Sequence, residues 1–178
     1  MNNKKVEIAI IGTGSAGMKA YREASKKTDS IILIEGNAYG TTCARVGCMP
    51  SKLLIAASEA ANYGHHAKGF GVTYENCKID GKKVMSRVRN ERDRFVGFVV
   101  GDVEDWPKEH KIFGQAKFES DHILNVKTKD GDVKIEADKV IIATGSRPRI
   151  IDSLKNLGDR VIVNDDLFDF EDLFDLED

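Results

Sequence analysis

The fold of this chain is decided by residues 6–24, which read VEIAIIGTGSAGMKAYREA. Residues 6–11 form a compact apolar run with β-branched side chains, which predicts a buried strand, and residues 18–24 predict a helix. The spacing G-x-G-x-x-G between them predicts a tight strand-to-helix turn. Another apolar run at residues 31–34 predicts a second strand, which ends at Glu35. This order of elements favours an α/β fold built on a parallel sheet.

The three glycines of this turn predict a dinucleotide-binding site. Gly12 permits the tight turn, Gly14 lets the backbone approach a pyrophosphate, and Gly17 lets the helix and the strand pack closely. The phosphates are expected at the helix N-terminus, where backbone N–H groups are free to bind anions. Glu35 is placed to accept hydrogen bonds from ribose hydroxyls and disfavours a 2′-phosphate. This spacing alone leaves NAD and FAD both open.

A second motif occupies residues 40–52, which read GTTCARVGCMPSK. Cys43 and Cys48 are five positions apart, and such positions point about 140° away from each other on a regular helix. Joining the sulfurs therefore requires a distorted turn, which Gly47 and the helix-starting Pro50 can supply. Closing so short a loop stabilises a fold by only roughly 2 kcal/mol, so the bond makes a poor structural staple. The motif predicts a redox-active disulfide.

Two free thiols or half of a metal site are the alternatives for this pair. A zinc site needs further Cys or His ligands, but the third cysteine, Cys77, stands alone and no His-x3–5-His spacing occurs. The adjacent His65 and His66 point in different directions on a helix or a strand, so they are expected at the solvated surface. No metal is expected.

Length and composition place limits on the remaining function classes. The 178 residues suit one domain, or one domain with an appendage. The net charge of −2 gives no overall preference for nucleic acid or for an anionic membrane surface. No span approaches the ~20 apolar residues of a transmembrane helix. A lone C-x4-C fits catalytic chemistry in a reducing compartment, so a soluble, cytoplasmic protein is expected.

Two further helices are predicted after the cysteine motif. The first covers residues 51–63, and the second runs from about Gly81, capped by Asp80, to Trp106. Their apolar residues recur at helical spacing and are expected to make core contacts. These residues are Leu53, Ala56, Ala57 and Ala60 in the first helix, and Val84, Val88, Phe95, Phe98, Val99 and Val103 in the second.

The following part of the chain predicts short strands. Residues 122–126 and 133–136 alternate around Asp130-Gly131, which is a hairpin signal. Another buried strand is predicted from Lys139 and ends in a turn that contains Gly145. A turn at the carboxyl end of such a strand lies where α/β sheets bind ligands.

The chain resembles the class I pyridine nucleotide-disulfide oxidoreductases. Four features carry the resemblance: the glycine turn, Glu35, the Cys43/Cys48 motif with its Pro-Ser-Lys tail, and residues 143–148 (ATGSRP). The likeness is greatest to dihydrolipoyl dehydrogenases and covers roughly residues 6–173, in order and with suitable spacing. The cysteine motif is far more specific than the glycine turn. The resemblance resolves the cofactor of this chain as FAD, with NAD as the second cofactor of the complete family enzyme.

The resemblance also implies an organisation and residue roles. It implies a Rossmann-like FAD- and disulfide-binding domain over residues 1–150, with a C-terminal extension and acidic tail over 151–178. Cys43 would exchange with a dithiol substrate such as dihydrolipoamide, while Cys48 would face the flavin. Lys52 would lie near the reactive flavin nitrogen. The implied cofactor-binding residues are Gly12, Gly14, Ser15, Ala16, Gly17, Glu35, Gly40, Thr41, Thr42, Gly47, Lys52, Ala116, Ala143, Thr144 and Gly145.

The chain departs from the family pattern in several places. Thr41 stands where a second glycine is common, and Ala44-Arg45 replaces an aliphatic-Asn pair. The family's second glycine-rich NAD(P)H-binding unit, third flavin motif and dimer-interface domain with its His-Glu pair are not expected within these 178 residues. His110 and His122 do not match that pair, so no catalytic role is expected for them.

The expected function is therefore that of a dihydrolipoyl dehydrogenase-like FAD domain, in a truncated form or fragment. Mercuric or glutathione-reductase-like relatives, a non-catalytic flavin-binding or interaction module, and a nicotinamide-binding Rossmann protein remain alternatives. The resemblance implies a homodimer. The chain ends in two near-copies, LFDFED at residues 167–172 and LFDLED at 173–178, for which a frayed tail or a short amphipathic helix is expected.

Overall fold

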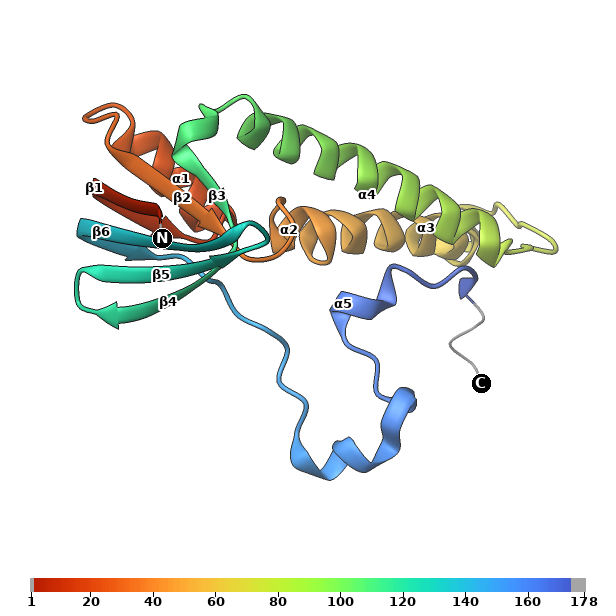
Figure 1. Ribbon diagram of the computed structural model, residues 1–178. Coiled ribbons are helices and arrows are strands. Elements are labelled where there is room, and N and C mark those ends of the chain that lie inside the picture. The colour runs from red at the N-terminus through yellow and green to blue at the C-terminus, as the bar shows by residue number, and fades with distance from the viewer. Residues whose placement is uncertain (1, 174–178) are drawn as a thin grey trace. The chain divides into compact units, whose positions relative to one another are not determined.

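The computed structural model describes residues 2–173, and their contacts group them into two compact units (Figure 1). Unit 1 comprises the chain up to Thr42 together with Gly97–Arg147. Unit 2 comprises Cys43–Val96 and the described residues from Pro148 onward. The predicted nucleotide-binding turn lies in unit 1, and both cysteines of the redox motif lie in unit 2.

Unit 1 is built on one six-stranded sheet with the strand order β3-β2-β1-β6-β5-β4. β1 pairs in parallel with β2 and with β6, and β2 pairs in parallel with β3. β4, β5 and β6 form an antiparallel meander. The mixed sheet confirms the predicted fold class, a Rossmann-like parallel sheet with helices and a small meander. The strands are β1 (Asn2–Ile11), β2 (Ile31–Glu35), β3 (Lys111–Phe113), β4 (Gln115–Ser120), β5 (Ile123–Thr128) and β6 (Gly131–Ile142).

The predicted hairpin forms between β5 and β6, where Thr128 pairs with Gly131. The prediction of two separate strands after this turn is wrong, because both belong to β6. The first half of β6 pairs with β5 as far as Glu136, and pairing with β1 continues to Ile142. Backbone pairing with β1 therefore carries the strand past the polar residues that interrupt its apolar pattern.

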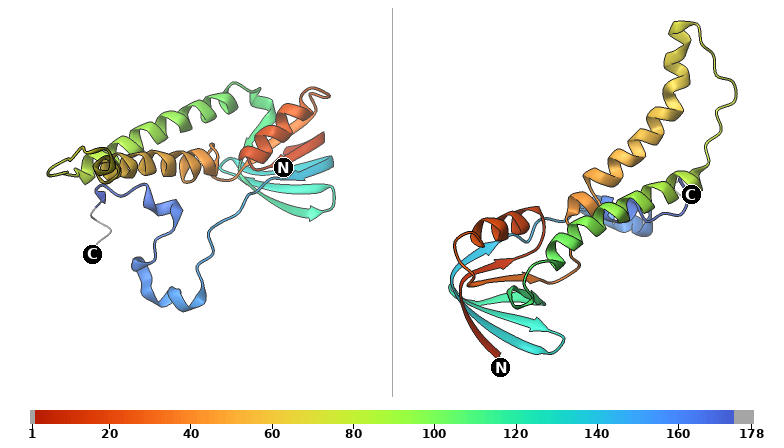
Figure 2. Two further views of the ribbon diagram at one scale, coloured as in Figure 1. Left: turned by 180° about the vertical axis from the view of Figure 1, so that it is seen from behind. Right: turned by 90° about the horizontal axis from the view of Figure 1, so that it is seen from above.

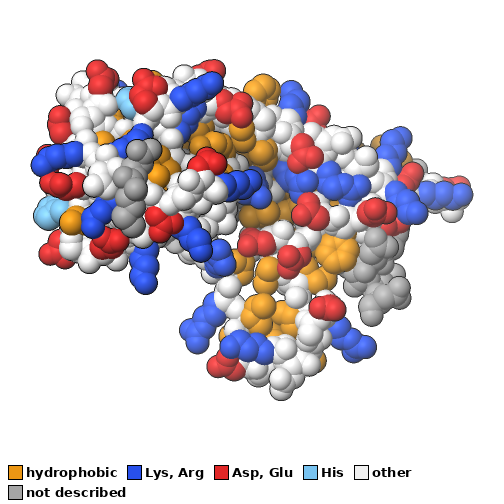
Figure 3. All heavy atoms as spheres, viewed as in Figure 1, with side chains coloured by type: hydrophobic (Ala, Val, Ile, Leu, Met, Phe, Trp, Pro, Cys, Tyr) orange, Lys and Arg blue, Asp and Glu red, His pale blue; other side chains and the backbone are white. Residues whose placement is uncertain are grey.

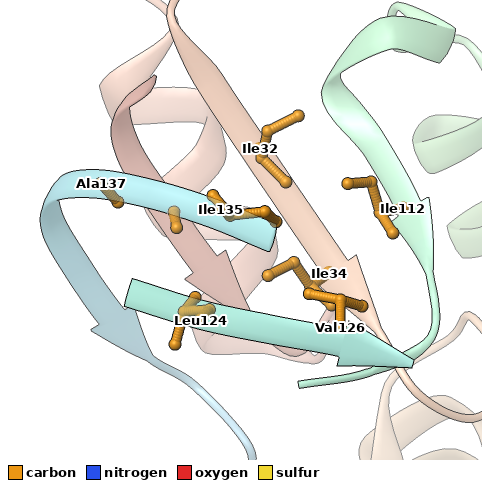
Figure 4. Packing of buried hydrophobic residues seen from close by; sticks show 8 residues of the cluster. Ile32, Ile34, Ile112, Leu124, Val126, Ile135 and Ala137 are labelled. Carbon is orange, nitrogen blue, oxygen red and sulfur yellow. The ribbon is translucent and has the colours of Figure 1, made fainter. Parts of the chain in front are cut away.

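Alternating side chains of β2 enter two different hydrophobic clusters, as the two-residue repeat of a strand requires. On one face, Ile32 and Ile34 pack with Leu124 and Val126 of β5 (Figure 4). Ile135 of β6 belongs to the same cluster, and its side chain is fully buried. The meander thus supplies the apolar side chains that cover this face of the parallel strands.

The other face of β2 is covered by α1 (Ser15–Ala24). Tyr21 of this helix packs with Ile31 and Leu33, and its ring stacks on Trp106 with the ring centroids 4.1 Å apart. The Tyr21 hydroxyl forms a hydrogen bond of 2.8 Å with Nδ1 of His110, the last residue of the short 3-10 helix η2 (Lys108–His110). His110 therefore has a structural role in unit 1.

The first of the two long helices is longer than predicted, and the second ends two residues earlier than predicted. α2 (Thr42–Arg45) is a single turn, and α3 (Cys48–Ala67) begins at Cys48 rather than at Ser51. A 3-10 turn, η1 (Lys68–Phe70), follows, and an exposed loop leads to α4 (Figure 2). α4 (Gly81–Glu104) starts as predicted, since the Lys83 backbone N–H donates to the Asp80 carboxylate at 3.0 Å.

Three of the residues predicted to make core contacts in these helices are exposed. Ala56 and Ala60 lie on the open face of α3, whereas Leu53 and Ala57 are half-buried. Phe98 is 62% exposed, because it lies one turn from Arg94 and one turn from Asp102 on the charged face of α4. Helical spacing alone did not distinguish these residues from Val88 and Val103, which are fully buried.

The C-terminal part of unit 2 contains the 3-10 segment η3 (Asp152–Arg160) and the short helix α5 (Asn164–Leu167). The predicted frayed tail is wrong for the first of the two near-copies. Phe168 is only 2% exposed, and the Arg92 guanidinium of α4 pairs with the Asp169 carboxylate at 2.6 Å. An aromatic anchor and an ion pair therefore hold this segment. The second near-copy lies outside the described residues apart from Leu173.

The surface carries a mixture of charges. On the face drawn in Figure 3, Lys and Arg side chains are interspersed with Asp and Glu. Apolar side chains are exposed between Ile150 and Ile162 in unit 2. None of the described helices combines the length and apolar character that crossing a bilayer requires.

Candidate functional site

The glycine turn brings the ends of β1 and β6 into close contact. Gly12 has φ of +102°, a conformation that favours glycine, and its backbone N–H donates to the Ile34 carbonyl at 2.7 Å. A Cβ added to Gly12 would lie 2.4 Å from the Ala143 carbonyl oxygen. A Cβ on Gly17 would lie 1.8 Å from the Gly12 carbonyl oxygen. Both glycines are therefore required for the packing of the turn.

Gly14 differs from its two neighbours in the motif because its missing side chain faces open space. A Cβ added there would meet no atom within 4 Å. Gly14 is also the N-cap of α1, with no side-chain cap and no acidic residue in the first turn, and Ser15 and Ala16 are exposed. The first N–H groups of α1 thus face an open, uncapped cradle, which fits the pyrophosphate of a dinucleotide.

Glu35 is held in a fixed position beside this turn. Its Oε2 accepts hydrogen bonds from the Thr13 backbone N–H at 2.8 Å and from the Thr13 hydroxyl, and its Oε1 accepts from the Asn37 backbone N–H at 2.9 Å. A carboxylate has about four acceptor positions, so one remains for a ribose hydroxyl at Oε1. Thr13 is fully buried, and the sequence reasoning missed this positioning role. A hydroxyl-bearing residue directly after the first glycine was the available signal.

The other predicted residues of unit 1 lie on loops or strands around this edge. Because β1, β2 and β6 are parallel, Gly12, Glu35 and Ala143 lie at the same edge: Glu35 ends β2, and Gly12 and Ala143 directly follow β1 and β6. Gly145 has φ of +69° in the loop after β6, beside Thr144. The remaining residues are Gly40 and Thr41, between β2 and α2, Thr42, the first residue of α2, and Ala116 of β4, which pairs with Val126 of β5.

The cysteine pair of unit 2 lies where the chain passes from α2 to α3. Cys43 is on α2 and half-buried, whereas Cys48 is the first residue of α3 and exposed. Gly47, between them, has φ of −124° and ψ of −118°, which breaks the helix as the distorted turn requires. Both are free cysteines in the structure, which corresponds to the dithiol form of the predicted redox-active pair. The two thiols are neighbours, because a side-chain hydrogen bond with Cys48 is the largest influence on the pKa of Cys43.

This contact changes the acidity of Cys43. The hydrogen bond to Cys48 raises the pKa of the Cys43 thiol above its ordinary value, and burial raises the pKa further.

Lys52 lies one turn beyond Cys48 on α3 and is exposed. Among residues 2–173, no group of three or more His, Cys, Asp or Glu side chains is arranged to hold a metal ion.

We expect Cys43 to be alkylated slowly near neutral pH and faster as the pH rises, because only the thiolate is nucleophilic. Replacing Cys48 with alanine removes the hydrogen bond that raises the pKa of Cys43, so its rate profile should move to lower pH. Site-resolved mass spectrometry after iodoacetamide treatment over about pH 7 to pH 10 measures this profile. The exposed Cys77 is the internal control, and an unmoved Cys43 profile would contradict the assigned contact.

Comparisons with known proteins agree with this geometry. A model of the family "pyridine nucleotide-disulphide oxidoreductase" matches residues 6–175. The chain is 34% identical to a glutathione reductase of Yarrowia lipolytica over 80% of its length and 32% of that protein. It is 30% identical to a dihydrolipoyl dehydrogenase of Cupriavidus necator over 94% of its length and 37% of that protein.

A solved structure shares the fold. It is a Cu(II) complex of a mutant of the HOCl-induced flavoprotein disulfide reductase RclA from Escherichia coli, with a TM-score of 0.74 and 23% identity over 97% of this chain and 36% of that one. The chain spans about a third of the length of the curated relatives named above. The proteins of the matched family bind FAD and use NAD(P). On the extent of the family match and the identity to these relatives, the chain belongs to the pyridine nucleotide-disulphide oxidoreductase family.

Proposed function

We propose that this chain is the FAD- and disulfide-bearing part of a disulfide oxidoreductase that resembles dihydrolipoyl dehydrogenase. The observation that carries the proposal is the pair of hydrogen-bonded thiols, Cys43 and Cys48, at the entrance to α3. The substrate class is a dithiol or its disulfide, such as dihydrolipoamide, and NAD is the final electron acceptor of the complete enzyme. We propose a homodimer for that enzyme, with residues 1–150 as the FAD domain and 151–178 as the start of an extension.

The residues of unit 1 suit a bound FAD. The open cradle at Gly14, Ser15 and Ala16 would hold the pyrophosphate, and Glu35 would hold the ribose through the free acceptor position of Oε1. The other proposed contacts are those implied by the family likeness. They comprise Gly12, Gly17, Gly40, Thr41, Thr42, Gly47, Lys52, Ala116, Ala143, Thr144 and Gly145. When bound, FAD supplies a centre that accepts and returns an electron pair.

The cysteines perform thiol-disulfide exchange with balanced bonds and electrons. The Cys43 thiolate attacks one sulfur of a disulfide substrate, the substrate S–S bond breaks, and the released substrate sulfur takes up a proton. Cys48 then attacks the Cys43 sulfur as its own proton leaves, so the Cys43–Cys48 bond forms and the second substrate sulfur departs as a thiol. The pair loses two electrons and the substrate gains two. The reverse sequence oxidises a dithiol.

The test is a visible spectrum of the chain purified with added FAD, recorded before and after anaerobic addition of dihydrolipoamide. We expect a bound flavin that absorbs near 450 nm about as strongly as free flavin does. This absorbance should fall when the dithiol is added. A Cys48→Ser variant should bind FAD equally but keep its absorbance. Failure to bind any flavin would overturn the cofactor assignment. Bound flavin that no dithiol reduces would instead indicate a non-catalytic flavin-binding module.

A further inference from the structure

The two-residue link between α2 and α3 contains a backbone carbonyl that accepts no hydrogen bond from the helical pattern of either helix. Val46 and Gly47 are the two residues between α2 and α3. The Gly47 carbonyl accepts from both the backbone N–H and the hydroxyl of Ser51, at 3.2 Å and 2.7 Å. The Val46 carbonyl has no equivalent donor four residues later, because that residue is Pro50, which lacks an N–H. The break at Gly47 also removes this carbonyl from any helical ladder.

A distant residue of unit 2 supplies the donor. The side-chain amide of Asn164, the first residue of α5, donates to the Val46 carbonyl at 3.0 Å. The two residues are 118 positions apart in the sequence. A second donation from the same amide nitrogen, to the Asp165 carboxylate at 3.0 Å, fixes the orientation of the amide.

The segment that carries Asn164 is firmly attached to α4. Phe168 is buried, and its carbonyl accepts from the Arg92 guanidinium at 3.3 Å. The same guanidinium pairs with Asp169, and the Arg89 guanidinium donates to the Phe170 carbonyl. We call residues 164–170 the strap. Asn164 itself is exposed, and these contacts of the strap with α4 hold its backbone, so the amide is positioned to donate.

We propose that Asn164 is a positioning residue for the redox pair: its amide holds the Val46 carbonyl, and so the two-residue link, in the conformation that keeps the Cys43 and Cys48 sulfurs together. This inference rests on the proposed function. The link is short, so a rotation at Val46 or Gly47 moves Cys43 relative to Cys48 directly. Holding the sulfurs together favours the intramolecular disulfide over two separated thiols, which is an effect on effective concentration.

The experiment measures the equilibrium between the Cys43–Cys48 dithiol and its disulfide in glutathione redox buffers. It is done on the full chain with Cys77→Ser, so that only the pair reports. Asn164→Leu keeps the size of the side chain and removes the donor, whereas Asn164→Gln keeps an amide donor. We expect Asn164→Leu to lower the equilibrium constant for disulfide formation about threefold to tenfold, the range for loss of one hydrogen bond. Asn164→Gln should recover at least half of that loss on a logarithmic scale.

The matched control is Asn90→Leu, the same substitution at an exposed position of α4 in unit 2. It should leave the equilibrium constant unchanged, and urea unfolding should show that all variants are folded. An unchanged constant in Asn164→Leu, an equal change in Asn90→Leu, or no recovery in Asn164→Gln would each overturn the proposal. The equilibrium requires no flavin. A chain that fails the flavin test can therefore still support or refute the role of Asn164.

Discussion

Replacing Gly17 with alanine is expected to lower the free energy of unfolding by roughly 3 kcal/mol, which is a large effect for one added methyl group. The new Cβ would lie 1.8 Å from the Gly12 carbonyl oxygen, a backbone atom that cannot rotate away. Alanine is the better helix former by about 1 kcal/mol, so helix propensity alone predicts the opposite sign. The steric conflict outweighs propensity because it separates α1 from the turn that joins β1 to it.

Gly14→Ala is the matched variant, with the same chemical change three residues earlier. Gly14 has φ of −71°, and its added Cβ would meet no protein atom within 4 Å. We expect the stability of the FAD-free chain to change by no more than about 1 kcal/mol, the scale of N-cap preferences. Binding of FAD should nevertheless weaken at least about tenfold, because the methyl group would occupy the cradle proposed for the pyrophosphate.

Urea unfolding of the FAD-free variants and a titration with FAD separate the two effects. A destabilised Gly17→Ala beside a stable, weakly binding Gly14→Ala supports distinct packing and binding roles. Equal stability losses in both variants would show that the open space at Gly14 is not as described. Normal FAD binding by Gly14→Ala would place the pyrophosphate elsewhere.

Replacing either cysteine of the pair with serine is expected to slow reduction of the bound flavin by a dithiol at least about a thousandfold. The physical reason is that an intramolecular partner has an effective concentration far above that of any thiol in solution. Cys43→Ser removes the sulfur proposed to attack the substrate. Cys48→Ser removes the sulfur that resolves the mixed disulfide, so a stable adduct with Cys43 should accumulate.

Cys77→Ser is the control for this pair, because Cys77 is an exposed thiol in the loop before α4. It should reduce the bound flavin at the rate of the unchanged chain. Stopped-flow absorbance measures the rates, and intact-protein mass spectrometry detects the adduct. An adduct that accumulates on Cys48 in Cys43→Ser, with none on Cys43 in Cys48→Ser, would reverse the proposed roles of the two sulfurs.

The local patterns of the sequence were sufficient for the parts of the fold that depend on nearby residues. The apolar run before Gly12 forms β1, the acidic residue after residues 31–34 ends β2, and Asp80 caps α4. Each of these features is determined by interactions over a few residues, which is the range over which periodicity and capping operate. The clash that a Cβ on Gly17 would cause is local in the same sense.

Other features depend on partners that are distant in the sequence. Helical periodicity predicted core contacts for both Phe98 and Val103, although Phe98 is exposed and Val103 is buried. Spacing identifies a face of the helix but not the segment that covers it. A frayed tail was predicted for the segment around Phe168 because its contacts are distant in the sequence: Arg92 of α4, which donates to the Phe168 carbonyl, is 76 positions away.

The glycine turn, the acidic residue beside it, the cysteine pair at the entrance to a helix, and with them the family, could all be predicted from local sequence patterns. What holds these groups in place could be seen only in the folded chain. It showed Thr13 fixing Glu35, and Asn164 supplying the donor that Pro50 cannot give to the Val46 carbonyl. A motif specifies the residues that perform chemistry. The groups that position them are chosen by the path of the whole chain, because a single hydrogen bond can come from any segment that passes within reach.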